Sequence, residues 1–436
     1  MALLGLVGLL LELRSDPKFT ANGASQDDLF LALVENLSLN ATSFTDQQTA
    51  ALALASSQDP RAVTLLVDLL AQTGDPALLD TLQQALITLG PPAIPELQRL
   101  NLTLANQILT LGPEQRLLPQ LRQRTVKRTL AQILVLHSGR FNGVELSNTN
   151  LSQVVEGPDA FTLLLEKQAL AGIIWRNAIL NGARLRKAVF FDPGGDGRLD
   201  TFDDWITDFS GSDLTEASLV AAQLRHAIFH NTSLLRTNLS NAQAQYADFS
   251  GANAGSAWFI QADLSSSVFN NTSLVGADLT NAQLSQASLV EARLKQAYLV
   301  GATLTDAVLI RADLSDADLS DANLQGAKLD QANLSNSRLQ GTDLSRAILT
   351  EANLQGADLQ GITLSQANLT GTNFGGARFF IPEQRQPNGF IATLTEPEPN
   401  NALAGVDFSE ALNLSWEQLQ YICRQGGIHP ACADQP

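Results

Sequence analysis

"ADLSDADLSDANLQGAKLD", residues Ala312 to Asp330, places a leucine at every fifth position. An α-helix has 3.6 residues per turn, so a step of five would scatter these leucines around its surface. On a β-strand, an odd step would send successive leucines to opposite faces. Neither regular element explains a period of five residues.

The same period continues far beyond this stretch. From position 209 to position 379 there are 35 such positions in one unbroken phase, and Leu or Phe occupies 33 of them, the exceptions being Ala244 and Ala254. Two residues earlier, Ala, Ser or Thr occupies 34 of the 35 positions, with Ile362 as the exception. One residue earlier, Asp or Asn occupies 16 of the 35.

A square coil explains this pattern physically. If the chain turns by about 90° after every five residues, four repeats make one coil, and coils stack at the β-strand spacing of about 4.8 Å. The Leu or Phe then points into the coil, above the residue twenty positions earlier. The second inward residue must be small to fit beside it, and Asp or Asn suits the turns by bonding nearby backbone.

This pattern resembles that of the pentapeptide-repeat family from Phe209 to Phe379. The resemblance implies a right-handed quadrilateral β-helix. Earlier repeats are degenerate: Phe141, Leu146 and Leu151 share one phase, and Leu180, Leu185 and Phe190 share another. The changes of phase indicate insertions near 154–172 and 191–208, and we expect the β-helix to span 139–380, regular from 209.

The N-terminal part is predicted to be helical. "DPRAVTLLVDLLAQTG" (59–74) and "DPALLDTLQQALITLG" (75–90) both begin with Asp-Pro and end with Gly, which suit a helix start and a helix end. Apolar residues between them keep helical spacing. The segment resembles HEAT-like repeats, including those related to phycobilin lyases. We therefore expect an α-helical domain over 1–138 and an α+β multidomain protein.

Two segments of this region suggest contacts. "RLLPQLRQRTVKR" (116–128) is the one basic patch, and it predicts either a solvated helix face or a site for an acidic partner or a lipid surface. The apolar run Leu3–Leu11 ends at Glu12 and is too short to span a bilayer. It is interpreted as a first amphipathic helix or as the tail of a membrane anchor that begins before this start site.

One insertion partly matches a calcium loop. In "DPGGDGRLDTFDD" the residues Asp192, Asp196, Asp200 and Asp203 occupy positions 1, 5, 9 and 12 of the EF-hand pattern. Gly194 stands at position 3, where a ligand is required, and position 12 lacks the usual Glu. A surface loop is the preferred interpretation, and weak calcium binding is the alternative. No other cofactor is expected.

The C-terminal residues 381–436 are predicted to form an irregular connector followed by a capping helix. "SWEQLQYICRQGG" carries a capping box, Ser415 with Gln418, and an apolar face of Trp416, Leu419, Ile422 and Cys423. A solenoid exposes unpaired strand edges at its ends, so we expect this helix to cover one end. The two cysteines, Cys423 and Cys432, either form a disulfide or are free thiols.

Outward positions twenty residues apart should share a face, and one face carries β-branched residues. Apolar and polar residues alternate along it, and a second column carries aromatic residues. We predict a protein-interaction surface that comprises Ile228, Val268, Val290, Val308, Ile310 and Ile348, together with Trp258 and Tyr298.

These features favour a non-enzymatic interaction scaffold. The four histidines form no metal-binding or catalytic motif, and no phosphate-binding loop or nucleophile elbow occurs. The net charge of −17 argues against binding nucleic acid through its phosphates. A protein partner or a second copy of the chain is expected, in the cytoplasm or near the thylakoid of a bacterium, because the combination of repeats resembles cyanobacterial proteins.

Two other functions are considered. Some pentapeptide-repeat proteins inhibit a type II topoisomerase by imitating DNA, and the regular repeats carry 15 acidic and 9 basic residues. Arg225, Arg236, Arg293, Arg311 and Arg346 interrupt that negative charge. The resemblance to bilin-lyase repeats suggests a bilin-handling or phycobiliprotein-associated factor as the other alternative.

Overall fold

The computed structural model describes residues 26–37, 43–141, 143–155, 160–194, 197, 204–379 and 403–433. It contains two compact units, residues 1–130 and 131–436, and the division falls within helix α8 (Leu117–Leu136). The apolar run Leu3–Leu11 lies outside the described residues.

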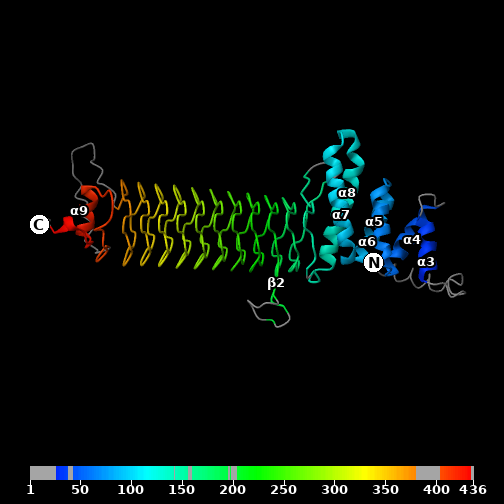
Figure 1. Cartoon of the computed structure of the whole chain (residues 1–436), viewed down its shortest axis with the longest axis horizontal. Coiled ribbons are helices and arrows are strands. Elements are labelled where there is room, and N and C mark those ends of the chain that lie inside the picture. Colours follow the sequence, from blue (N-terminus) through cyan, green and yellow to red (C-terminus); the bar gives the residue numbers. More distant parts are fainter. Residues whose placement is uncertain are drawn as a thin grey trace, which may run out of the picture. The chain divides into compact units, whose positions relative to one another are not determined.

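The first unit consists of stacked helices (Figure 1). They are α3 (Gln26–Leu37), α4 (Phe44–Ser56), α5 (Arg61–Gln72), α6 (Pro76–Leu89), α7 (Ile94–Thr110) and the start of α8, with 3-10 turns η1 (Pro91–Ala93) and η2 (Pro113–Gln115). Helix α4 packs on α6, and α5 packs on both α6 and α7. None of the helices that the structure describes is both long and apolar enough to cross a bilayer.

The predicted helix signals are only partly realised. Asp75 is the N-cap of α6, its side chain accepts from Ala77 N at 2.9 Å, and Gly90 ends the helix with φ 71°. In the preceding repeat Asp59 accepts from Arg61 N at 2.9 Å, but Pro60 is the N-cap and Thr73 is the C-cap of α5. The Asp-Pro and Gly signals therefore locate these helices to within two residues.

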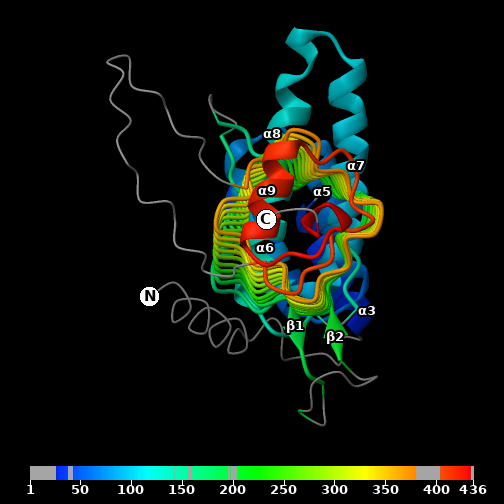
Figure 2. The ribbon, with the colours of Figure 1, turned by 90° about the vertical axis from the view of Figure 1, so that its left-hand side faces the viewer.

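The second unit is a β-helix solenoid, built from short parallel bridges. From Asp208 to Arg378 the bridges join residues twenty apart, for example Asp208 to Ile228 and Asp358 to Arg378. Each coil contributes four bridges, one per side, and Figure 2 shows the coils stacked along the axis. The predicted coil of twenty residues is confirmed.

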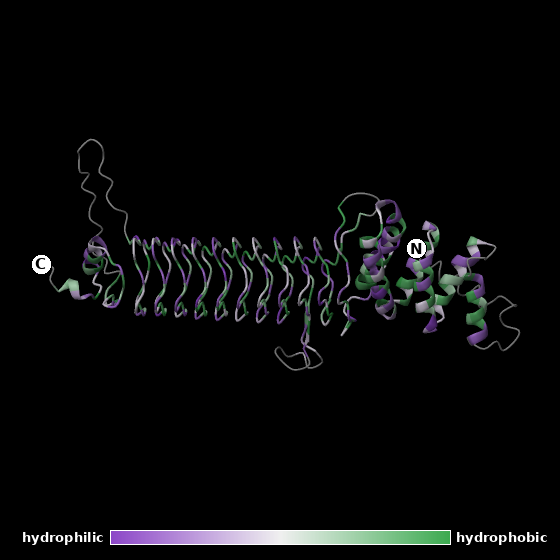
Figure 3. Cartoon of the chain, turned by 45° about the horizontal axis from the view of Figure 1, so that its top comes forward, coloured by the Kyte–Doolittle hydropathy of each residue, from purple (hydrophilic) through white to green (hydrophobic). Residues whose placement is uncertain are grey.

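The interior of the rod contains the two inward residues of each repeat. The Leu or Phe positions from 209 to 379 are buried, and Phe209, Phe229, Phe249 and Phe269 form a column with ring centroids 5.1, 4.8 and 4.6 Å apart. Apolar and polar residues alternate along each coil (Figure 3), as inward and outward directions require.

The corners are four-residue turns whose third residue has positive φ. In the turn 209–212, Ser212 N donates to Phe209 O at 2.9 Å, and Gly211 has φ 68°. Non-glycine residues such as Glu216 (φ 60°) also adopt this conformation. Asp or Asn before the inward residue accepts from the backbone two residues on, as Asp208 does from Ser210 N at 2.8 Å. These side chains have the predicted role in the turns.

The second predicted insertion is confirmed, but the first is shorter than the predicted 154–172, because Leu164 and Ala169 pair in the ladder with Arg184 and Val189. Glu145 pairs with Ile174, 29 residues later, and Ile174 pairs with Asp208, 34 residues later. The first insertion closes through the antiparallel bridge between Val154 and Phe161. The second closes through the antiparallel pair β1 (Phe191–Asp192) and β2 (Trp205–Ile206), which stands beside the rod in Figure 2. Parallel bridges continue on both sides of each insertion.

Residues 403–433 continue the ladder beyond the regular repeats. Leu412 pairs with Asn373, and Asp407 pairs with Ile428. Helix α9 (Trp416–Arg424) begins with the predicted capping box of Ser415 and Gln418, and the 3-10 turn η3 (Pro430–Cys432) follows it.

Candidate interaction surface

The predicted β-branched residues lie in register on one side of the rod. Bridges connect in turn Asp208, Ile228, Asp248, Val268, Ser288, Val308, Lys328, Ile348 and Asn368. We call the apolar members of this side, Ile228, Val268, Val308 and Ile348 with Val290 and Ile310, the stripe. Their side chains point outward but are half-buried, because each one lies between neighbours in adjacent coils. The stripe is therefore a row of apolar side chains that alternate with polar ones from coil to coil.

The opposite side carries the two predicted aromatic residues. Bridges connect Asn238, Trp258, Asp278, Tyr298, Asp318, Arg338, Asp358 and Arg378. The side chains of Trp258 and Tyr298 are 42% and 53% exposed, which makes them more accessible than any member of the stripe. Sequence periodicity placed both residues in one column, and the bridges confirm that placement.

Ion pairs connect several acidic side chains with arginines of the adjacent coil. Arg338 Nη1 lies 3.3 Å from Asp318 Oδ2, and Arg378 Nη2 lies 3.1 Å from Asp358 Oδ2. Glu216 and Glu291 pair in the same way with the arginines twenty residues later, Arg236 and Arg311. This pattern interrupts the continuous negative charge that an imitation of DNA requires.

His230 and Asp248 form another pair between coils, with Nε2 and Oδ2 2.7 Å apart. Partial burial acts to raise the pKa of the Asp248 carboxyl, but hydrogen bonds from Ser250 and His230 outweigh it, so the pKa lies below its ordinary value. Asp248 is thus an ionised structural acceptor.

Most of the predicted calcium loop cannot be compared with the structure. Asp192 is exposed, and its Oδ1 accepts from Gly194 N at 3.0 Å. Asp196, Asp200 and Asp203 lie outside the described residues. Within the described ranges, no three His, Cys, Asp or Glu residues are grouped so that they could hold a metal ion. Calcium binding by this loop stays a prediction.

The basic segment 116–128 mainly serves the helical unit. Arg122 Nε donates to Thr73 O at 2.9 Å, and Arg122 Nη2 donates to Gln72 O at 2.5 Å, at the C-terminus of α5. A cation at this position stabilises the helix dipole. Lys127 is buried, and burial lowers its pKa to about 8. Arg128 is the one exposed basic residue in this segment. The structure therefore indicates a packing role for Arg122 and Lys127, which differs from both predicted alternatives, a solvated helix face and a docking site.

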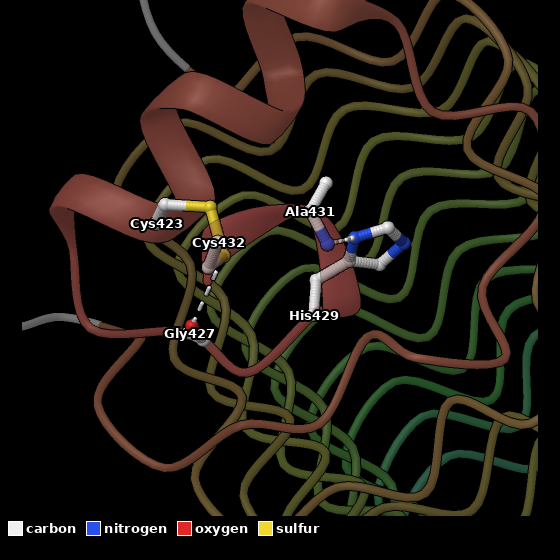
Figure 4. The surroundings of a disulfide bond; sticks show 5 residues. All are labelled: Cys423, Gly427, His429, Ala431 and Cys432. Carbon is white, nitrogen blue, oxygen red and sulfur yellow. Dashed lines mark hydrogen bonds between the residues drawn. A yellow bond between two sulfur atoms is a disulfide. The ribbon is translucent and has the colours of Figure 1, made fainter. Parts of the chain in front are cut away.

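The C-terminal segment contains a buried glutamine, Gln418, for which the sequence indicated a capping box but no contact with the rod. Gln418 Nε2 donates to Phe374 O at 3.0 Å and to Ala377 O at 2.7 Å. The predicted apolar face of α9 is only partly correct, because Ile422 is buried but Trp416 is 62% exposed. Cys423 and Cys432 form a disulfide, and Cys432 Sγ lies 3.7 Å from Gly427 O (Figure 4).

A small aromatic stack was also not predicted. His226 lies between Phe191 and Tyr246, with ring centroids 5.8 and 5.1 Å away, and the guanidinium of Arg225 lies 4.6 Å from the centre of the Tyr246 ring. His226 and Tyr246 occupy corner positions twenty residues apart, so the period indicates that they are neighbours. The contact with Phe191 depends on the path of the insertion, which no repeat specifies.

Comparison with known protein families assigns the rod. The family model described as pentapeptide repeats matches eight overlapping segments, 207–231, 217–253, 247–286, 257–296, 287–326, 317–354, 327–366 and 347–380. The chain belongs to the pentapeptide-repeat family. The matched residues of this pentapeptide-repeat protein coincide with the regular coils.

Several solved structures of pentapeptide-repeat proteins are similar to this one. HetL, involved in heterocyst differentiation regulation in the cyanobacterium Nostoc sp. strain PCC 7120, is 25% identical; the match covers 58% of this chain and 96% of HetL, with a TM-score of 0.43. QnrB1, a plasmid-mediated fluoroquinolone resistance protein, is 18% identical. The match covers 37% of this chain and 80% of the QnrB1 chain, with a TM-score of 0.31.

A third similar structure comes from the thylakoid lumen of Arabidopsis thaliana. This Arabidopsis pentapeptide-repeat protein is 30% identical. The match covers 28% of this chain and 72% of the Arabidopsis chain, with a TM-score of 0.23. All three TM-scores are low, so the assignment to the family rests on the repeats themselves. No curated protein sequence matches this pentapeptide-repeat protein.

Proposed function

We propose that this pentapeptide-repeat protein is a non-enzymatic scaffold that holds a protein partner along the stripe. The observation that supports this is the register of Ile228, Val268, Val308 and Ile348 on one side of a repetitive rod. Apolar surface removed from water by a partner stabilises the complex by about 25 cal/mol per Å² before the costs of association. A straight row of this kind suits an elongated partner or a second copy of the chain.

The other segments have supporting roles in this proposal. The helical unit is a HEAT-like adaptor with a second extended surface, as its stacked pairs α4–α6 and α5–α7 suggest. Helix α9 is the cap of the C-terminal end, since Gln418 satisfies two carbonyl groups there and Ile422 is buried. The ion pairs between coils argue for this role over imitation of DNA. The location, cytoplasmic or thylakoid-associated, belongs to the same proposal.

Replacing Val308 and Ile310 with glutamate tests the proposal. Both side chains point outward while Leu309 between them is buried, so the fold should persist. The wild-type protein and the double variant are used as baits in lysate of the native organism, and their own mass is measured by light scattering. We expect the variant to lose the captured partner or to become monomeric. Equal capture and equal mass for both proteins would contradict the proposal.

A matched control is available in the same coil. Thr303 lies on the neighbouring side of the rod, in the position that corresponds to Val308, and it is similarly half-buried. Thr303→Glu together with Thr305→Glu introduces the same charge one side away. The control variant should retain the partner, because its substitutions leave the stripe unchanged.

A further inference from the structure

The aromatic side of the rod contains an acid that differs from its neighbours. Trp258, Asp278 and Tyr298 are consecutive members of one column, joined by parallel bridges. Both aromatic side chains are exposed, at 42% and 53%, and the half-buried carboxylate stands between them. Farther along the column, Asp318 and Asp358 each form an ion pair with the arginine of the next coil.

Asp278 has no such cation within the part of the chain that the structure describes. Both neighbours of Asp278 in the column are aromatic, whereas Asp318 and Asp358 each have at least one arginine as a neighbour. Its Oδ1 accepts from Thr280 N at 2.9 Å, the same turn bond that other aspartates of the rod make. No ring stacks on Trp258 or Tyr298, and no cation lies over them, among the described residues. A carboxylate and two ring faces are therefore available to a ligand.

The spacing of the column suits an organic cation. Coils are about 4.8 Å apart, so a group level with Asp278 lies roughly 4.8 Å from the coil of each aromatic residue. Cation–π attraction acts within about 6 Å of a ring centre. A guanidinium is planar, stacks on aromatic rings and offers two parallel N–H groups to the two oxygens of a carboxylate, whereas an ammonium is a compact point charge without that planar fork. The outward Ile260 and Val300 follow the two aromatic residues and offer apolar surface to an aliphatic stem.

We propose that Trp258, Asp278 and Tyr298 form a binding site for an arginine side chain of a partner protein. The inference rests on the proposed scaffold function and adds a specific contact on the side opposite the stripe. The net charge of −17 favours the approach of a basic segment.

The test uses the full chain and a fluorescein-labelled hexaarginine peptide, with fluorescence anisotropy as the readout. Asp278→Asn keeps the shape of the side chain and the acceptor for Thr280, and circular dichroism confirms that the fold is kept. The matched control is Asp213→Asn. Asp213 occupies the equivalent position on another side and accepts from Thr215 N at 3.0 Å, but its neighbours in the column are Ile179 and Ser233.

We expect Asp278→Asn and Trp258→Ala each to weaken binding of hexaarginine at least fivefold, and Asp213→Asn to weaken it less than twofold. A hexalysine peptide of equal charge should bind the wild-type protein more weakly than hexaarginine. Equal losses for Asp278→Asn and Asp213→Asn would show non-specific attraction to an acidic protein and overturn the proposal. Equal binding of the two peptides would overturn the assignment to arginine.

Failure of this site can be distinguished from failure of the scaffold proposal. None of these substitutions changes a residue of the stripe. If hexaarginine shows no dependence on Asp278 while the Val308→Glu, Ile310→Glu variant loses its partner, the arginine site is wrong and the scaffold stands. If the site behaves as expected but the stripe variant keeps its partner, the stripe is wrong.

Discussion

The coil of residues 241–260 should have tightly coupled interior positions. Its four central inward residues are Ala244, Phe249, Ala254 and Phe259, where other coils carry leucine at most of these positions. The rings of Phe249 and Phe259 come from opposite sides and meet edge-on, with centroids 5.9 Å apart. We infer that the two rings fill the interior, so that the remaining two sides of this coil have room only for alanine.

Two substitutions and their combination test this explanation. Ala244→Leu adds volume to a filled interior and should cost about 1–3 kcal/mol of unfolding free energy. Phe249→Ala removes a ring that stacks 4.8 and 4.6 Å from two others, and it should cost about 3–5 kcal/mol. In the double variant the new leucine occupies part of the vacated space. Its cost should therefore be smaller than that of Phe249→Ala alone.

The assay is urea unfolding of the full chain, followed by circular dichroism in the β-sheet region for the wild-type protein and all three variants. Substitutions that act independently add, whereas residues that share a cavity show a coupling energy of about 0.5–3 kcal/mol. A double variant whose cost equals or exceeds the sum of the two single costs would refute the explanation that the alanines compensate for the rings.

Three other predictions concern the corners, the helical unit and the second insertion. Gly251 has φ 67°, and a Cβ there would lie 2.5 Å from Asn231 Oδ1, so Gly251→Ala should destabilise the rod by more than about 1 kcal/mol in urea unfolding. Adding Asn231→Ala removes the close contact and should recover part of that loss. Failure to recover any stability would contradict the importance of this contact. Burial lowers the pKa of Lys127 from 10.5 to about 8. Between pH 8 and pH 10.5 the unfolded chain therefore holds a proton that the folded chain has released. The free-energy cost of burying the Lys127 ammonium is full below pH 8 and disappears as the pH rises toward 10.5. The effect of Lys127→Met on the free energy of unfolding, followed by the helical signal, should therefore be more favourable at pH 7 than at pH 10, by at most about 3 kcal/mol; an equal effect at both pH values would contradict this. The loop 192–204 should show no micromolar calcium binding in calorimetric titration, because one ligand position is Gly194; a tight isotherm that disappears in Asp196→Ala would overturn this expectation.

The regular rod could be predicted from the sequence in detail because one residue spacing determines several structural properties. The position of Leu309 in the period of five makes it inward, and it also makes Val308 outward and a neighbour of Ser288 and Lys328, as the bridges show. The same reasoning placed Trp258 and Tyr298 in one column. The two insertions were detected as changes of phase, since an inserted segment shifts every later repeat.

Contacts that cross irregular segments could not be predicted. Gln418 reaches the carbonyl groups of Phe374 and Ala377, more than forty residues earlier, and the sequence indicated only that it belongs to a capping box. The basic segment suggested a solvated helix face or a docking site because its charges are adjacent in sequence. Its placement against α5 gives Arg122 carbonyl partners inside the unit. No local pattern encodes such partners.

The most direct measurement of the scaffold function is site-specific photo-crosslinking in the native organism. A photo-reactive phenylalanine analogue replaces Val308 of the stripe in one strain and Thr303 on the neighbouring side in another. Both positions are half-buried and lie in the same coil. The proposal predicts a discrete crosslinked adduct from position 308 and none from position 303. Absence of an adduct at 308, or the same adduct at both positions, would contradict binding of a partner along the stripe.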